Sequence, residues 1–164
     1  MKIAQITPYD FHHPGGVSEH IGRLRDEFTK LGHTVVVIAP RSQKGGLEVE
    51  AGFYGIGRTV SIPGNGSRVR LTFDVTLYAA VKELMRREQF DVVHFHEPLT
   101  PVLPYMVLLN SRAVNVATFH AARDTNPWYA MERSASEAVA RSIESWRVVR
   151  DQWAEAAFER LYSA

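Results

Sequence analysis

Four short apolar segments, rich in β-branched residues, constrain the fold of this chain more than any other feature. They lie at residues 2–7, 34–39, 91–96 and 115–120, and they lack the strict alternation of polar and apolar residues. Strands of this kind are buried on both faces, as in the parallel sheets of α/β proteins. The sequence therefore predicts an α/β fold with a Rossmann-like parallel sheet and helices on both faces.

A helical pattern connects the first two of these segments and predicts a βαβ unit. It covers residues 17–31 and ends at Gly32, which suits a helix C-terminus. A right-handed crossover places the turn after the first strand at the carboxyl edge of the sheet, where ligands of such folds bind. The apolar residues of this helix recur at helical spacing: Val17, Ile21, Leu24, Phe28 and Leu31.

Residues 40–65 are rich in glycine and serine and predict an excursion from the sheet. Short strands are expected at residues 59–62 and 69–73, forming a hairpin. A basic amphipathic helix is then expected over residues 75–88, and a further helix over residues 101–111 links the third and fourth apolar segments. In the first of these helices we expect buried Val75, Tyr78, Ala79 and Leu84 or Met85, and exposed Lys82, Arg86 and Arg87.

The chain divides into a Rossmann-like domain at residues 1–124 and a C-terminal segment at residues 125–164. Apolar residues at helical spacing predict one long helix or two over residues 131–162. This segment is expected to pack on the domain or on a partner. If its stripe with Trp146, Val149 and Trp153 is exposed, we expect either self-association, as a homodimer through the 131–162 helix, or a missing partner.

Charge and composition exclude several classes of function. The 19 basic and 18 acidic residues give a net charge of +1, so no global field favours nucleic acid as a partner. The absence of cysteine excludes disulfides and thiolate chemistry and suits a cytoplasmic protein. The first apolar segment becomes polar at Thr7, too early for a signal peptide. The apolar residues 101–109 are less than half of the ~20 needed to cross a bilayer, so any membrane contact is expected to be peripheral.

The glycine pair Gly15-Gly16 lies in the turn between the first strand and the first helix. Glycines let an anion approach the free amides of a helix N-terminus, so a diphosphate would fit there, although an ordinary βα turn explains the pair equally well. Neither G-x-G-x-x-G nor G-x-x-x-x-G-K-[ST] occurs in the sequence, which disfavours dinucleotide-binding enzymes and P-loop NTPases. G-x-S-x-G is also absent, which disfavours a hydrolase.

Histidines end two of the buried segments. His94 and His96 point to the same face of the third strand, while Glu97 and His120 belong to a different face or strand end. We therefore expect a hydrogen-bonded histidine pair and no metal site, because a catalytic zinc needs three protein ligands. His120 lies at the carboxyl edge, where it donates to a substrate hydroxyl or caps the adjacent turn. His20 and His33 are interpreted as structural.

Five separated motifs, taken in order, resemble the retaining GT-B glycosyltransferases of family four. The similarity covers about residues 2–122 and is closest to the bacterial phosphatidylinositol mannosyltransferase branch. In that branch Ile62-Pro63, Asn65-Gly66-Ser67 and Arg70-Leu71 also find counterparts. The motifs are Ile6-Thr7-Pro8-Tyr9, Pro14-Gly15-Gly16-Val17 with His20, Leu31-Gly32-His33-Thr34-Val35, Asp91-Val92-Val93-His94-Phe95-His96-Glu97-Pro98 and Val116-Ala117-Thr118-Phe119-His120.

The resemblance implies that this chain is the N-terminal, acceptor-side half of a GT-B fold, without the C-terminal domain that binds the donor. Such enzymes transfer a sugar from a nucleotide-diphosphate donor (GDP-mannose or a UDP-sugar) to a hydroxyl, with retention. Gly15 and Gly16 would bind the donor phosphate, and His120 would contact the transferred sugar. Tyr9, Asn65, Ser67 and Arg70 would contact the acceptor, which in this branch carries a phosphoinositol head group. No cofactor is implied.

Two further expectations follow. Lys82, Arg86 and Arg87 form a basic helix face that fits either an anionic membrane surface or solvent. The expected location is cytoplasmic, and the first alternative implies peripheral attachment at the inner face of the membrane. The isolated chain is expected to be inactive because the donor ligands of the family are absent. The alternative is a free-standing, non-catalytic Rossmann-like module for binding or assembly. After His120 the chain reads Ala121-Ala122-Arg123-Asp124, where the branch has hydroxyl residues. The resemblance therefore does not fix the identity of the acceptor.

Overall fold

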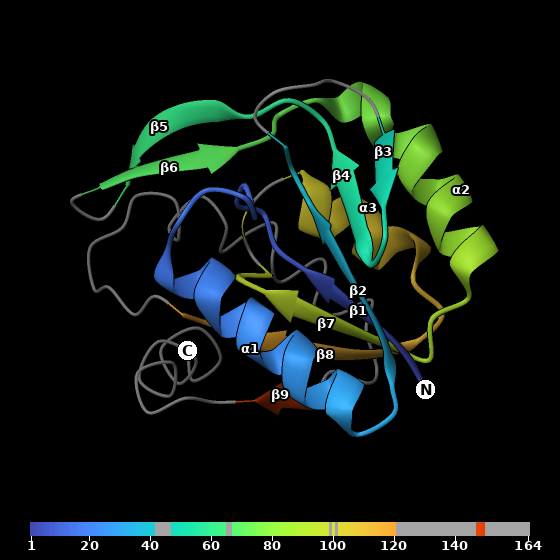
Figure 1. The fold of residues 1–164 in the computed structure, drawn as a ribbon. Coiled ribbons are helices and arrows are strands. Elements are labelled where there is room, and N and C mark those ends of the chain that lie inside the picture. The colour runs from blue at the N-terminus through green and yellow to red at the C-terminus, as the bar shows by residue number, and fades with distance from the viewer. Residues whose placement is uncertain (42–46, 65–66, 99, 101, 121–146, 150–164) are drawn as a thin grey trace, which may run out of the picture.

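A mostly parallel sheet, built outward from its first strand, organises the molecule (Figure 1). The computed structural model describes residues 1–41, 47–64, 67–98, 100, 102–120 and 147–149. The elements are β1 (Lys2–Ile6), α1 (Gly16–Lys30), β2 (Thr34–Ala39), β3 (Leu47–Glu50), β4 (Phe53–Ile56), β5 (Val60–Gly64), β6 (Ser67–Leu71), η1 (Val75–Leu77), α2 (Tyr78–Glu88), β7 (Val92–His96), α3 (Leu103–Asn110), β8 (Val114–Thr118) and β9 (Arg147–Val149).

The described strands of the main sheet run in the order β3-β4-β2-β1-β7-β8-β9. All neighbouring pairs are parallel except β3 and β4, which pair antiparallel. Because β1 pairs with both β2 and β7, the carboxyl ends of these strands share one edge with that of β8. The predicted parallel sheet is therefore confirmed.

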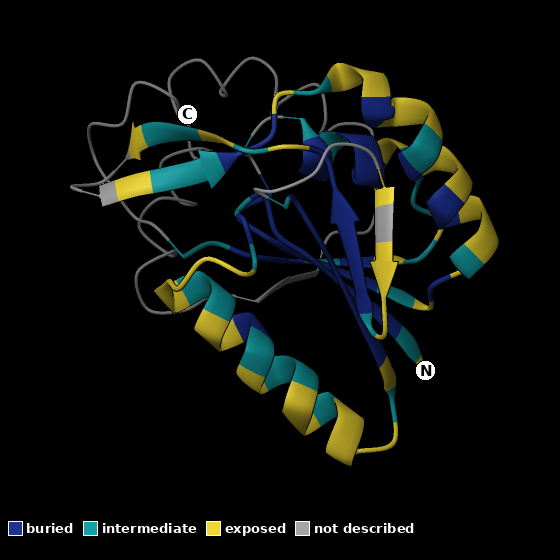
Figure 2. Ribbon diagram, turned by 45° about the horizontal axis from the view of Figure 1, so that its top comes forward, coloured by how far each residue is buried: buried dark blue, intermediate teal, exposed yellow. Residues whose placement is uncertain are grey.

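Helices cover both faces of this sheet, as predicted. Helix α1 lies on one face, and α2 and α3 lie on the other (Figure 1). Side chains of β2 alternate between the two layers: Val37 packs with Ile21 of α1, and Val36 packs in the cluster that includes α2 and α3. Figure 2 shows the same division, with buried central strands and an exposed outer side of α1. Burial on both faces explains why the strand sequences do not alternate.

The segment at residues 40–65 contributes more to the sheet than the sequence analysis predicted. Strand β4 pairs in parallel with β2, and β3 then pairs with β4, so the main sheet continues where only an excursion was expected. The apolar Phe53, Tyr54 and Ile56 of β4 are buried there. The predicted hairpin is confirmed: β5 and β6 form a separate antiparallel pair with Val60 opposite Leu71.

The predicted helix at residues 75–88 exists, but its buried face was predicted wrongly at three positions. Val75, Tyr78 and Ala79 are exposed. The helix begins with the 3₁₀ turn η1, and the residues that face the core follow a different stripe from the predicted one. Lys82, Arg86 and Arg87 are exposed as expected. The buried residues on η1 and α2 are Leu77, Val81, Leu84 and Met85.

The C-terminal helix prediction is wrong at residues 147–149. These residues form β9, which pairs in parallel with β8. Two adjacent valines favour an extended strand on a sheet edge over a helix. The rest of the predicted 131–162 helix, and with it the expected homodimer, lies outside the described residues. Within the described residues, no helix is both long enough and apolar enough to span a bilayer.

A small polar network joins the beginning of the chain to the end of α2. Lys2 Nζ lies 2.6 Å from Glu88 Oε2, and the hydrogen bond and charge of Lys2 hold the pKa of Glu88 well below its usual range, at about 2. Tyr54 and Arg87 also hydrogen-bond to Glu88 and lower this pKa further. The Glu88 side chain is only 12% exposed, so the ionised carboxylate depends on these partners.

We predict that Glu88→Gln lowers the free energy of unfolding by roughly 1 kcal/mol near neutral pH. The folded-state pKa of about 2 lies below the ordinary 4.5, so the stabilisation is complete above about pH 4.5 and is lost as the pH falls toward 2. Urea unfolding of both proteins at neutral pH and in acid checks this, because the gap between them should narrow in acid. Glu83→Gln removes an exposed pair with Arg86 and should change stability little. A gap that does not change with pH contradicts the prediction.

Candidate functional site

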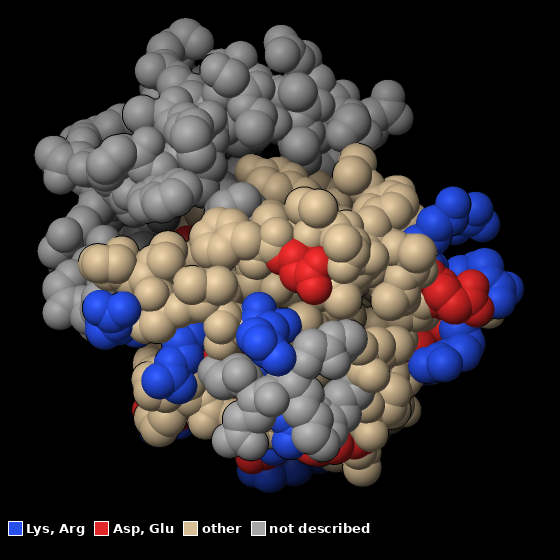
Figure 3. All heavy atoms as spheres, turned by 90° about the horizontal axis from the view of Figure 1, so that it is seen from above, with Lys and Arg blue, Asp and Glu red and all other residues tan. Residues whose placement is uncertain are grey.

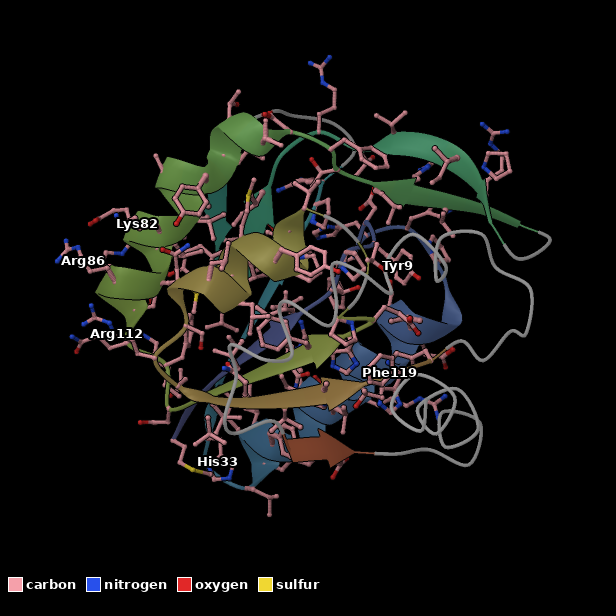
Figure 4. The ribbon with its side chains drawn as sticks, turned by 180° about the vertical axis from the view of Figure 1, so that it is seen from behind. Tyr9, His33, Lys82, Arg86, Arg112 and Phe119 are labelled. Carbon is pink, nitrogen blue, oxygen red and sulfur yellow. The ribbon has the colours of Figure 1, made fainter. Side chains whose placement is uncertain are left out.

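A pocket opens at the carboxyl edge of the sheet, where the loops after β1, β7 and β8 meet. Its volume is about 530 Å³, and loop residues, the start of α1 and the hairpin strand β6 line it. Figure 4 shows Tyr9 and Phe119 on this side of the molecule, far from His33 at the opposite end of the strands. Five of the predicted site residues line the pocket: Tyr9, Gly15, Gly16, Arg70 and His120.

Two predicted acceptor residues are not placed by the described structure. Asn65 lies outside the described residues, and Ser67 begins β6 without a described side chain. In the sequence, Asn65 falls between β5 and β6, and Ser67 is the first residue of the strand that carries Arg70. The structure therefore brings together the glycine turn, Tyr9, Arg70 and His120. The acceptor contacts of Asn65 and Ser67 stay predictions.

The glycine turn keeps the approach to helix α1 open. Gly15 is the N-cap residue of α1 and provides no side-chain cap. A Cβ atom at Gly15 or Gly16 would have no heavy atom within 4 Å, so glycine here relieves no clash. Its effect is to leave the backbone amides of the first helical turn accessible from the pocket, where the helix dipole favours an anion.

The β5–β6 hairpin is attached to the loop after β1, which places a cation on the pocket wall. Asp10 N donates to Arg70 O at 3.1 Å, and Tyr9 forms an isolated antiparallel bridge with Leu71. The Arg70 guanidinium Nη1 lies 3.2 Å from His13 Nδ1. By contrast, Arg68 donates to Ser61 Oγ at 2.9 Å on its own hairpin. Arg70 is therefore the hairpin arginine tied to the loop of the site.

A chain of hydrogen bonds runs from β1 through β7 to the residue after β8. Gln5 Oε1 lies 2.6 Å from His96 Nε2, and His96 Nδ1 lies 2.8 Å from His120 Nε2. An amide oxygen only accepts, so His96 Nε2 carries the hydrogen. His96 Nδ1 then accepts a hydrogen bond from His120 Nε2–H. The chain fixes the ring of His120 on the pocket wall.

His94 and His96 lie on the same face of β7, as predicted, with ring centroids 4.3 Å apart. His94 Nε2 lies 2.8 Å from Thr118 Oγ1. Burial, with smaller contributions from the charges of His20 and His120, lowers the pKa of His94 to about 4. Burial is also the main reason that the pKa of His96 is lowered. Both rings are neutral at physiological pH and act through hydrogen bonds.

Glu97 holds the loop that presents His120. It is buried, it adopts a left-handed backbone with φ 56°, and its carboxylate accepts a hydrogen bond from the backbone N–H of His120. Its own N–H donates to Thr118 O at 2.9 Å. The sequence analysis did not assign these roles to Gln5 and Glu97. Because β7 lies between β1 and β8, Gln5 comes next to His96, and Glu97 comes next to His120. These contacts join distant segments, so no local sequence motif indicates them.

His20 was interpreted as structural, but α1 carries it to the same edge of the sheet. Its ring centroid lies 5.0 Å from that of His120 and 5.8 Å from that of His96. His33, at the other end of α1, packs beside Phe28, in agreement with the structural role expected for it. Helix periodicity alone does not reveal that the first turn of α1 faces the ends of β7 and β8.

The fold is similar to one half of a GT-B glycosyltransferase. The structure is similar to that of MurG from Acinetobacter baumannii, a GT-B glycosyltransferase, with a TM-score of 0.55 over 93% of this chain and 42% of that chain. The sequence identity is 11%, so this similarity concerns the fold alone.

The family model for glycosyltransferase family 4 matches residues 14–156, which is most of the chain. The chain therefore belongs to glycosyltransferase family 4, as the motifs predicted. Among curated proteins it is 41% identical over 120 residues to the phosphatidyl-myo-inositol mannosyltransferase of Mycobacterium tuberculosis, covering 73% of this chain and 31% of the relative. The corresponding enzyme of Propionibacterium freudenreichii is 36% identical over 127 residues, covering 74% and 33%.

A more distant relative carries a different transferase name. A phosphatidylinositol N-acetylglucosaminyltransferase subunit from Arabidopsis thaliana is 29% identical over 125 residues, covering 70% of this chain and 25% of that protein. The chain thus spans about a quarter to a third of the length of the curated relatives it matches. These relatives are named as transferases of mannose and of N-acetylglucosamine.

Proposed function

We propose that this chain is the acceptor-side half of a retaining glycosyltransferase that uses a nucleotide-diphosphate sugar, GDP-mannose or a UDP-sugar. The sugar is transferred to a hydroxyl of an acceptor of the phosphoinositide-lipid type. The observation that carries the proposal is the pocket in which an open helix N-terminus, the cation Arg70 and the oriented His120 converge. The mannosyltransferase names of the relatives support the choice of sugar and acceptor.

In this proposal the donor diphosphate lies against Gly15 and Gly16. The open start of α1 offers backbone N–H groups and the positive end of a helix dipole. The C-terminal domain of the GT-B fold supplies the remaining donor contacts. His120, held by the chain from Gln5 through His96, donates to a sugar hydroxyl next to the bond that breaks.

The two acids on the pocket wall hold loops in place. Asp10 accepts from His12 N at 3.1 Å through Oδ1, and Glu97 accepts from the backbone of His120. Both are almost completely buried. Each carboxylate therefore accepts a hydrogen bond from a loop backbone, which supports a structural role for both acids. We infer that the acceptor proton goes to the leaving diphosphate, as the family resemblance implies.

Arg70 is proposed to bind the acceptor phosphate, and Tyr9, Asn65 and Ser67 are proposed as further acceptor contacts. A guanidinium matches phosphate oxygens in a bidentate pair, and the link of Arg70 to the loop after β1 limits its freedom before binding. An acceptor without a phosphate would leave this cation without its proposed counter-charge.

We predict that substitutions of His120 and Arg70 affect different kinetic constants in the chain expressed together with a donor-binding domain. His120→Asn should lower kcat with GDP-mannose and a phosphoinositide acceptor by about 100-fold or more. Arg70→Gln should mainly raise the KM for the acceptor, by about tenfold. Steady-state kinetics of purified proteins measure both effects.

Arg58→Gln serves as the matched control, because Arg58 is exposed and does not line the pocket. It should leave both constants unchanged. Equal kinetics for the His120 variant and the wild type would contradict the role proposed for His120. An unchanged acceptor KM in the Arg70 variant would contradict the phosphate contact.

We predict that residues 1–164 alone do not turn over GDP-mannose or UDP-sugars, because they span only about a third of the mannosyltransferase relatives and the remaining donor contacts are proposed to lie in the other part. Release of nucleotide diphosphate, followed with and without the acceptor, provides the measurement. Turnover by the isolated chain would contradict the prediction. If the chain joined to a donor-binding domain binds the ligands but transfers no sugar, the alternative of a non-catalytic binding module is favoured.

A second surface supports peripheral attachment to an anionic membrane. A recess of about 510 Å³ between α2 and the turn before β8 is lined by Lys82, Arg86 and Arg112. Figure 4 shows these three side chains on the same side of the molecule, away from Tyr9 and Phe119. Arg86 forms an ion pair with Glu83, and Arg87 forms one with Glu88, so the charges of both arginines are partly balanced. Figure 3 shows acidic side chains among the basic ones on the α2 side of the molecule. We therefore propose Lys82 and Arg112 as the main cations that meet lipid head groups.

We predict that the double variant Lys82→Glu with Arg112→Glu reduces binding to vesicles that contain phosphatidylinositol, measured by co-sedimentation at low salt. Each reversed charge should weaken the free energy of binding to the anionic vesicle surface by at least ~1 kcal/mol. Arg23→Glu with Arg25→Glu, a double variant on α1 across the sheet, is the matched control and should bind as the wild type does. Equal loss in both double variants would indicate a dependence on net charge alone and would contradict the proposed surface.

A further inference from the structure

The histidines His20, His96 and His120 come from three separate elements and meet at one point. His20 lies on α1, His96 ends β7 and His120 follows β8. One ring nitrogen from each histidine lies within 4.8 Å of those of the other two, and among the described residues this is the group of side chains arranged to hold a metal ion. Zinc takes three imidazoles at ~2.0–2.1 Å in open sites and keeps a fourth position for water or substrate.

The contacts of His96 match those of a metal-ligating histidine. Such a ligand donates its second ring N–H to a carbonyl or carboxylate oxygen, which fixes the tautomer and the ring orientation. Here Gln5 Oε1 receives His96 Nε2–H at 2.6 Å, and His96 Nδ1 is directed toward His120 Nε2 at 2.8 Å. Two imidazoles that share one hydrogen need to separate only slightly to hold an ion between them.

The third ring completes the site from the open side. The planes of His96 and His120 are inclined by only 19°, whereas His20 is turned by 70° and 72° relative to them. His20 is exposed and His120 half-buried, so an ion can enter from the solvent side of these two rings, while His96 is fully buried beside β1. The imidazole set is neutral and suits borderline transition metals such as Zn²⁺ better than Mg²⁺ or Ca²⁺.

We propose that His20, His96 and His120 form a binding site for a transition-metal ion of the Zn²⁺ type. Gln5 orients His96 from behind, and Glu97 holds the loop of His120. The sequence analysis expected no metal site because it assigned His20 to a structural role and counted only two imidazoles on one face. The site shares His120 with the proposed sugar pocket, so an ion bound here competes with the sugar for that side chain.

Binding of Co²⁺, a spectroscopic substitute for Zn²⁺, tests the site without any sugar donor. Titration of the purified chain is expected to give one equivalent of bound Co²⁺ with the visible ligand-field absorption of a four- or five-coordinate imidazole site, displaced by Zn²⁺. His20→Gln should weaken binding about tenfold or more, because it removes a ligand. His20 is exposed, so this variant should keep the fold, which circular dichroism verifies.

His33→Gln is the matched control: His33 lies at the far end of α1 and should leave Co²⁺ affinity unchanged. His120→Gln should weaken binding as His20→Gln does. The proposal is overturned if the wild type gives no such spectrum, if His20→Gln binds Co²⁺ as tightly as the wild type, or if His33→Gln loses binding equally. Because this readout needs no sugar transfer, its failure would leave the proposed transferase function standing, and the reverse also holds.

Discussion

The parallel pairing of β1 with β2 on one side and β7 on the other is the constraint on which the rest of the structure depends. It brings the carboxyl ends of these strands to one edge, and β8 extends that edge through its pairing with β7. Every side chain of the candidate site follows one of these strand ends, begins α1 or lies on the hairpin attached to the loop after β1. Loss of this register would disperse Gln5, His96 and His120.

The same pairing explains why polar groups are buried so close to the pocket. His96 is completely buried, a position that is costly for an imidazole without hydrogen-bond partners. Here each imidazole nitrogen of His96 has a partner, so the buried row becomes a rigid support for His120. Burial keeps His94 and His96 neutral, and neutral imidazoles serve equally as hydrogen-bond supports in sugar transfer and as metal ligands.

Sequence patterns predicted the sheet, helix α1 and the hairpin because these depend on local features: unalternated β-branched runs, helical periodicity and turn residues. They failed for β3 and β4, where short segments gain strand structure only by adding to the edge at β2. They also failed for the inner face of α2, where packing on the sheet buries Val81 and Leu84 and leaves Tyr78 exposed, and at β9, where pairing with β8 prevails over helical periodicity. In each case a non-local contact decided the outcome.

By itself, the sequence determined the α/β class, the glycine turn, membership of glycosyltransferase family 4 and the candidate residues Tyr9, Gly15, Gly16, Arg70 and His120. These follow from residue types at fixed spacing along the chain. Only the tertiary structure decided that Gln5 and His96 support His120, that Glu97 holds its loop and that His20 meets the same point. The physical reason is that these residues are brought together by strand register and helix packing between distant segments, which leave no local pattern in the sequence.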